Sequence, residues 1–115
     1  MEDCIFCKIA NREIDSEIIF ENETVVCFKD NNPQTQEHFL IVPKEHYDDL
    51  LEIAEYGADD AKDIIEAIPE IVDIVDIREK GFRIINNCGK GAGQSVFHVH
   101  FHLLADDNKL KETLV

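Results

Sequence analysis

Three histidines alternate with apolar residues near the end of the sequence. His98, His100 and His102 are separated by Val99 and Phe101, and successive side chains of a strand point to opposite faces. The three imidazoles should therefore share one face, roughly 6.8 Å apart, which is twice the rise per residue. Such a row can bracket a group of phosphate size. An imidazole can attack with one neutral nitrogen while a hydrogen bond fixes the tautomer at the other.

His100 is the natural nucleophile because an imidazole flanks it on each side. The rings of His98 and His102 can donate hydrogen bonds to phosphate oxygens as charge shifts in the transition state. A polar outer face that happens to use histidine is an alternative, but three of the five histidines of the chain lie in this one alternation. A zinc site built from the row alone is a second alternative, with poor tetrahedral geometry.

A separate pair of cysteines has the spacing of a metal site. Cys4 and Cys7 can supply half of a tetrahedral zinc site, which needs two further ligands, and His46 and His98 are the candidates. A reduced pair without metal is the alternative. Cys27 lies in an apolar run typical of a strand and is expected to be a buried thiol.

The overall charge limits the partners of the protein. Twenty-five acidic and eleven basic residues give a net charge of −14, which would repel nucleic acids and anionic membranes. Neither is expected as a partner, and any phosphate site must be built locally from histidines, backbone amides or a metal. The sequence has no signal peptide and no long apolar stretch, so we expect a cytoplasmic location. A length of 115 residues predicts a single domain, 1–115.

The elements that position these residues follow from the hydrophobic pattern. A polar connection at 21–23 suits a hairpin, 30–37 reads as an exposed loop and 88–93 as a glycine-rich loop. The runs rich in β-branched and aromatic residues predict strands at 17–20, 24–29, 38–42, 82–86 and 96–104. In the last of these, the side chains expected to enter the core are Phe97, Val99, Phe101 and Leu103.

Between the third and fourth predicted strands, the spacing of apolar residues predicts an amphipathic helix beginning near Ala61. Pro69 falls inside it, so a kink or a break into two helices is expected there. The order of the elements predicts an α+β domain with a mainly antiparallel sheet. The inward positions of the helix should be Ile64, Ile65, Ile68, Val72 and Val75.

The stretch 93–104 resembles the histidine-triad motif, His-φ-His-φ-His-φ-φ with φ apolar, of the HIT nucleotide hydrolases and transferases. The start of the chain, Cys-Ile-Phe-Cys-Lys-Ile, is similar to the Hint branch of that family, which contains adenosine 5′-monophosphoramidases. Residues 30–33 and 38–44 resemble the same branch. The resemblance implies the HIT fold, a five-stranded sheet with one long helix and a short N-terminal helix.

Carried over by position, the resemblance implies a nucleotidyl-histidine intermediate on His100. His98 and His102 support it, His38 is a fourth histidine near the phosphate, and Ser95 contacts the phosphate and the leaving amine. Asp30 would accept the ribose hydroxyls. Taken alone, Asp30 and Asn87 can equally be turn residues and Phe28 plain core. The implied nucleotide-binding set is Asp30, Asn87, Gly93, Gln94 and Ser95, with apolar walls from Phe6, Ile9, Ile14 and Phe28.

The resemblance also implies a function, a cofactor and a partner. The function is hydrolysis of purine nucleoside phosphoramidates to the monophosphate by a homodimer, with a structural Zn²⁺ on Cys4, Cys7, His46 and His98. A dinucleoside polyphosphate hydrolase and a zinc-stabilised nucleotide-binding or scaffold module are the competing functions. A nucleotidyltransferase is disfavoured because such relatives usually carry glutamine where this chain has His102.

Overall fold

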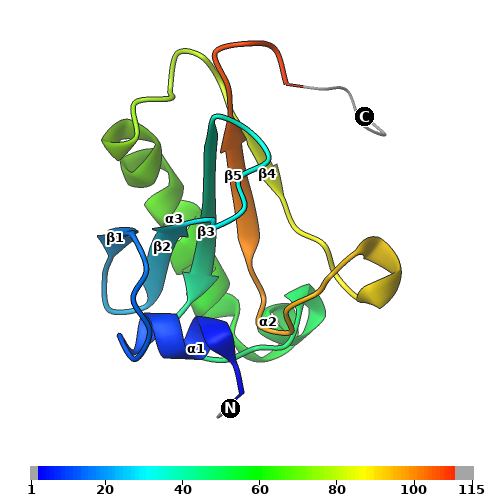
Figure 1. Cartoon of the computed structure of the whole chain (residues 1–115). Coiled ribbons are helices and arrows are strands. Elements are labelled where there is room, and N and C mark those ends of the chain that lie inside the picture. Colours follow the sequence, from blue (N-terminus) through cyan, green and yellow to red (C-terminus); the bar gives the residue numbers. More distant parts are fainter. Residues whose placement is uncertain (1–2, 111–115) are drawn as a thin grey trace.

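The computed structural model describes residues 3–110. Strands from the N-terminal and C-terminal parts of the chain form a single sheet (Figure 1). Its five strands lie in the order β1-β2-β3-β5-β4, and every neighbouring pair is antiparallel. The predicted α+β class with a mainly antiparallel five-stranded sheet is confirmed. The strands are β1 (Ile18–Glu21), β2 (Val25–Lys29), β3 (Glu37–Pro43), β4 (Arg83–Ile85) and β5 (Phe101–Ala105).

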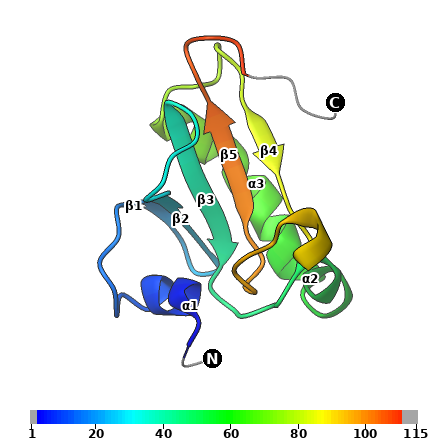
Figure 2. The same ribbon diagram turned by 45° about the vertical axis from the view of Figure 1, so that its right-hand side comes forward.

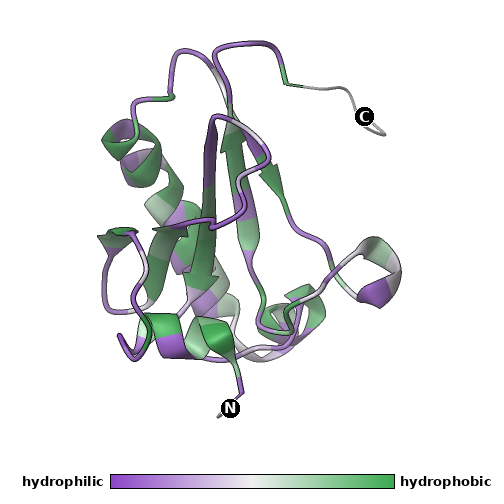
Figure 3. Cartoon of the chain, viewed as in Figure 1, coloured by the Kyte–Doolittle hydropathy of each residue, from purple (hydrophilic) through white to green (hydrophobic). Residues whose placement is uncertain are grey.

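The hairpin between β1 and β2 forms as the sequence predicts. Asn22 caps the turn, since its Oδ1 accepts hydrogen bonds from the backbone N–H groups of Thr24 and Val25 at 2.9 and 2.8 Å. β2 and β3 then lie at the centre of the sheet and are hydrophobic along most of their length (Figure 3). A strand of this composition needs cover on both faces.

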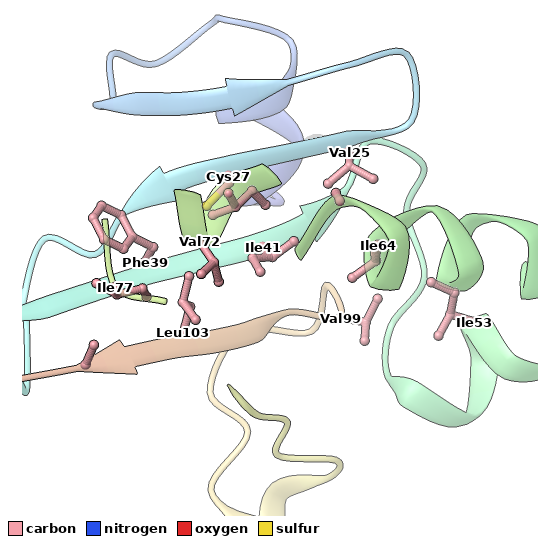
Figure 4. Close-up of a cluster of buried hydrophobic side chains, with 13 residues drawn as sticks. Val25, Cys27, Phe39, Ile41, Ile53, Ile64, Val72, Ile77, Val99 and Leu103 are labelled. Atoms are coloured by element: carbon pink, nitrogen blue, oxygen red, sulfur yellow. The ribbon is translucent and has the colours of Figure 1, made fainter. Parts of the chain in front are cut away.

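The two faces of the central strands belong to two separate hydrophobic clusters. Val25 and Cys27 of β2 contribute to the cluster that contains α3, and the alternate residues Val26 and Phe28 pack in the cluster of α1. Figure 4 shows the first cluster, in which side chains of the sheet meet those of α3. The thiol of Cys27 is fully buried, as predicted. The sheet therefore has a structural face under α3 and a second face that α1 covers only in part.

The long helix α3 (Ala58–Ile74) runs behind the sheet without interruption (Figure 2). Of the two alternatives predicted at Pro69, a kink or a break into two helices, the break is therefore wrong. Proline lacks the N–H that would bond the carbonyl of Ile65, and the side chain of Ile65 is 62% exposed, so water can reach that side of the helix. This exposure also corrects the prediction that Ile65 faces the core.

Three short helical segments complete the described chain. α1 (Ile5–Ala10) is the predicted short N-terminal helix. α2 (Leu50–Tyr56) was not predicted; Asp49 caps it by accepting a hydrogen bond from the N–H of Glu52 at 2.9 Å. A 3₁₀ turn (Lys90–Ala92) lies within the glycine-rich loop. None of the helices in residues 3–110 is long and apolar enough to cross a membrane.

The histidine strand is shorter than its alternation predicts. Ladder pairing in β5 begins only at Phe101, and the N–H of Val99 donates to the carbonyl of Tyr47 at 2.7 Å. Val99 and Leu103 are fully buried as predicted, but Phe97 is 39% exposed and does not enter the core. Of the three histidines, only His102 therefore lies in the ladder-paired part of the strand.

Candidate active site and metal centre

The ring of His100 is fixed by its own backbone neighbourhood. Its Nδ1 lies 2.8 Å from the carbonyl oxygen of His98. A carbonyl can only accept, so Nδ1 carries the proton and Nε2 keeps a free lone pair. The carbonyl of His100 in turn accepts a hydrogen bond from Nδ2 of Asn86 at 2.9 Å. The central histidine is thus held in the tautomer that a nucleophile requires.

A second chain of hydrogen bonds orients His102. The backbone N–H of Gln34 donates to Nδ1 of His38 at 3.0 Å, so the neutral His38 ring carries its proton on Nε2. This atom lies 2.9 Å from Nδ1 of His102 and 3.4 Å from Oδ2 of Asp30. When His38 donates to Nδ1 of His102, the proton of His102 must be on Nε2. That N–H is then available to a ligand.

Burial keeps the rings of this pair neutral. Desolvation lowers the pKa of His102 to about 4, with smaller contributions from His100 and His38. Desolvation also lowers the pKa of His38, against the opposing effect of Asp30. Near pH 7, His102 therefore offers a neutral N–H rather than an imidazolium.

His100 and His102 open into a cavity of about 220 Å³. One part is apolar: the ring of Phe6 lies edge-on to Phe28 and to His100, with centroids 5.4 and 5.1 Å apart. The carboxylate of Asp30 lies on the same lining. A pocket with apolar walls, a carboxylate and two imidazoles matches a nucleoside joined to a phosphate. The remaining lining residues are Ile5, Ile9, Ser16, Lys29, Asn31, Leu40, Ser95 and Val96.

Most of the residues predicted to bind nucleotide meet in this cavity. The structure brings together Phe6, Ile9, Phe28, Asp30, Ser95, His100 and His102, and places His38 directly behind His102. Ile14, Asn87, Gly93 and Gln94 are outside the lining. Ile14 is 38% exposed, whereas Gln94 is buried.

The side chain of Gln94 forms hydrogen bonds at the glycine-rich loop that precedes the histidines. Its Oε1 accepts from the N–H of Gly89 at 2.8 Å, and its Nε2 donates to the carbonyls of Asp48 and Val96 at 2.7 and 3.0 Å. These bonds hold both ends of the glycine-rich loop. Asn86 donates a hydrogen bond to the backbone of His100. The sequence predicts a role for its neighbour Asn87 instead, because no feature of the sequence distinguishes the two asparagines.

The cysteine pair lies next to this site with both of its predicted partners. Sγ of Cys4, Sγ of Cys7, Nδ1 of His46 and Nδ1 of His98 are all within 4.8 Å of one another. Sγ of Cys7 is 3.3 Å from His46 and 3.4 Å from His98, and Sγ of Cys4 is 3.2 Å from His98. Two sulfurs and two imidazole nitrogens are a typical donor set for tetrahedral zinc.

The tautomers at this cluster also suit a metal. Nε2 of His98 donates to the carbonyl of Pro43, and Nε2 of His46 donates to Oδ1 of Asp48, both at 2.8 Å. Both Nδ1 lone pairs therefore point to the sulfurs, and the carboxylate behind His46 is a common outer partner of a metal ligand. Burial lowers the pKa of His98 to about 4, which keeps its ring in the neutral form that binds metal.

The thiol of Cys7 needs a nearby cation to ionise. Burial, followed by hydrogen bonding and repulsion from Cys4, raises the pKa of the Cys7 thiol to about 12. A bound Zn²⁺ would supply the opposing charge. The residues present thus fit zinc in number, donor type and tautomer.

Asp30, His38 and His102 also place ligand atoms within 4.8 Å of one another. Their tautomers differ from those of the cysteine cluster. Because Nδ1 of His38 accepts from a backbone N–H, its Nε2, which faces the other two residues, is protonated and has no lone pair for a metal. The hydrogen bonds therefore indicate a metal centre at the cysteines and a proton-carrying pair at His38 and His102.

His98 lies within the candidate metal cluster rather than on the lining of the cavity. Its side chain is fully buried, and both ring nitrogens point away from the lining of the cavity. Of the three alternating histidines, only His100 and His102 reach the cavity. Through its carbonyl, His98 connects the candidate metal cluster to the ring of His100.

An antiparallel sheet that holds His100 and His102 beside a small cavity is shared with solved structures of other proteins. A histidine triad protein from Clostridium difficile is 44% identical with a TM-score of 0.92, over 98% of this chain and 97% of that one. A HIT family hydrolase from Clostridium thermocellum is 43% identical with the same TM-score, over 100% and 99%.

The family follows from the sequence comparisons. The HIT domain model matches residues 11–109. Protein HitA of Neisseria gonorrhoeae is 40% identical over 104 residues, which are 90% of this chain and 96% of that protein. The chain belongs to the HIT family.

Proposed function

We propose that the protein hydrolyses purine nucleoside phosphoramidates, such as adenosine phosphoramidate, to the nucleoside monophosphate. The observation that carries the proposal is the hydrogen bond from Nδ1 of His100 to the carbonyl of His98 at 2.8 Å. It leaves Nε2 of His100 free to attack a ligand in a cavity that is also lined by apolar side chains, Asp30 and His102. A structure with 34% identity and a TM-score of 0.81, described as a histidine triad nucleotide-binding protein from Candida albicans, supports a nucleotide ligand.

Each part of the proposed substrate would lie against a different part of the cavity lining. The purine would lie against Phe6, Ile9 and Phe28, whose apolar surfaces favour a flat ring. Asp30, at the end of β2, would accept hydrogen bonds from the two ribose hydroxyls. The α-phosphate would then lie between His100 and His102, with Ser95 beside the leaving nitrogen.

The reaction would have two displacement steps. Nε2 of His100 attacks the α-phosphorus, the phosphorus–nitrogen bond breaks, and the amine leaves with a proton delivered from solvent at the Ser95 side. Water then attacks the nucleotidyl-histidine, releases the monophosphate and restores the neutral ring. The Nε2–H of His102 would stabilise the charge on the phosphoryl oxygens in both steps.

Cys4, Cys7, His46 and His98 would hold a structural Zn²⁺ in the same protein. Zinc supplies folding energy by joining ligands from distant parts of the chain, in this case α1, the segment after β3 and the segment before β5. A cytoplasmic location, which keeps thiols reduced, is part of the proposal. Elemental analysis of the purified protein tests the zinc site, and one zinc per chain is expected.

The protein is also proposed to be a homodimer, as the family resemblance implies. The exposed apolar side chains of Ile65 and Ile74 on α3, 62% and 52% exposed, are available for an interface. Light scattering coupled to size-exclusion chromatography measures the mass directly. A mass of one chain would contradict this part of the proposal.

The decisive experiment compares two substrates and one variant. Wild-type protein should hydrolyse a fluorogenic adenosine phosphoramidate faster than diadenosine triphosphate, and His100→Ala should lose the activity while still binding AMP. Preference for diadenosine triphosphate would instead indicate a dinucleoside polyphosphate hydrolase. AMP binding without turnover of either compound would indicate a nucleotide-binding module.

A further inference from the structure

Helix α1 presents residues to two sites at once. Cys4, at its N-cap, and Cys7 turn their sulfur atoms to the metal centre, and the N–H of Cys7 also donates to Sγ of Cys4 at 3.2 Å. Phe6 and Ile9, from the same six-residue helix, line the nucleotide cavity. An isolated helix of this length is not stable in water, so its docking decides where these two side chains lie.

Packing links the same two sites a second time. The ring of Phe6 lies edge-on to both His98 and His100, with centroids 6.0 and 5.1 Å apart. His98 faces the sulfurs with Nδ1, and its carbonyl accepts the Nδ1–H of His100. A displacement of the metal ligands would therefore reach the wall of the cavity through Phe6 and the nucleophile through His98.

The other contacts of α1 are confined to one face of the sheet. Among the buried hydrophobic residues, Phe6, Ile9 and Ala10 belong to the cluster that contains Val26, Phe28, Leu40 and Val42, whereas the larger cluster under α3 contains no residue of α1. Undocking of α1 would thus uncover the nucleotide face of the sheet and leave the other face covered. A local opening of this kind costs less than global unfolding.

We propose that metal binding at Cys4, Cys7, His46 and His98 is thermodynamically coupled to nucleotide binding in the adjacent cavity. The inference rests on the proposed nucleotide site. Metal docks α1 and so completes the cavity wall, and a nucleotide packed against Phe6 and Ile9 holds α1 on the metal. By linkage, each ligand raises the affinity for the other by the same factor.

Two titrations measure the factor from opposite directions. Zinc affinity is determined by competition with a chromophoric chelator, without and with saturating AMP, and AMP affinity is determined calorimetrically for zinc-loaded and chelated protein. We expect AMP to raise zinc affinity by a factor within the roughly 5- to 150-fold range of allosteric coupling. The same factor should appear in AMP affinity. Equal affinities in both titrations would overturn the proposal.

Two variants test the route. Phe6→Ala retains all four metal ligands but removes the shared contact, so the coupling factor should fall towards one. Cys88→Ser changes a half-buried thiol outside the cluster and should keep the wild-type factor. An unchanged factor in Phe6→Ala would contradict transmission through α1.

Amide NMR spectra of the chelated protein separate a local effect from a global one. Signals of α1 and of residues 96–100 should change, while those of α3 persist. Loss of the α3 signals would mean that the metal stabilises the whole fold, which overturns the local coupling. If AMP binding and zinc binding are coupled but the protein does not hydrolyse phosphoramidates, only the proposed function is refuted. Absence of AMP binding to zinc-loaded protein would refute both proposals.

Discussion

The Nδ1–H of His100 donates to the backbone carbonyl of His98, two residues earlier, at 2.8 Å. The same His98 faces two cysteine sulfurs with one ring nitrogen and the carbonyl of Pro43 with the other. One residue thus anchors the candidate metal centre and sets the tautomer of the candidate nucleophile. Several measurable properties of the protein depend on this arrangement.

Asn86 and Asn87 should differ in their effect on turnover. Asn86→Ala removes the hydrogen bond to the carbonyl of His100, and a loss of about 1 kcal/mol in positioning corresponds to a roughly fivefold lower kcat. Asn87→Ala is the matched control and should retain wild-type kcat. Steady-state kinetics with the phosphoramidate substrate provides the comparison, and equal kcat values for the two variants would show that the contact has no role.

His38 should act on kcat rather than on KM. His38→Ala removes the donor to Nδ1 of His102, so the proton of His102 is no longer confined to Nε2, and kcat should fall on the order of tenfold. His38→Gln retains a side-chain N–H and should recover part of the loss. A rise in KM at constant kcat would instead assign His38 to ground-state binding.

Acid should destabilise the protein as the pH falls from 6.5, the ordinary pKa of histidine, to about 4, the pKa of His102. Burial lowers the pKa of His102 from 6.5 to about 4, so between these values the unfolded chain binds a proton that the folded chain does not. The free energy of unfolding therefore falls as the pH is lowered through this window. Urea titrations at several pH values should show a smaller decrease for His102→Asn, and identical pH profiles for the two proteins would contradict the assignment.

Gly57 should not tolerate a side chain. A Cβ at this position would lie 2.2 Å from the ring of Tyr47, and the carbonyl of Tyr47 accepts the N–H of Val99 next to His100. Gly57→Ala should therefore lower the free energy of unfolding by about 1–3 kcal/mol, measured by urea denaturation. Gly91→Ala, where a Cβ meets nothing within 4 Å, is the control and should be near neutral. Equal stability of the two variants would remove the steric argument.

The local pattern of the sequence is sufficient for much of the fold. The turn at Asn22, the buried runs of β2 and β3 and the amphipathic α3 follow from short-range preferences and from the periods of strand and helix. The alternation around His100 and His102 correctly places these two side chains on one face, opposite Leu103. The spacing of Cys4 and Cys7 also indicates a metal site, because ligand spacing is a local property.

Only the tertiary structure decides the rest. Strand periodicity predicts that the rings of all three histidines face the phosphate, but the ladder begins only at Phe101 and the ring of His98 faces the cysteines. Asn86, and not Asn87, bonds the carbonyl of His100, and Gln94 bonds the carbonyl of Asp48. Both hydrogen bonds join residues that are distant in the sequence. Local sequence determines which side chains alternate; packing between distant segments determines what each of them contacts.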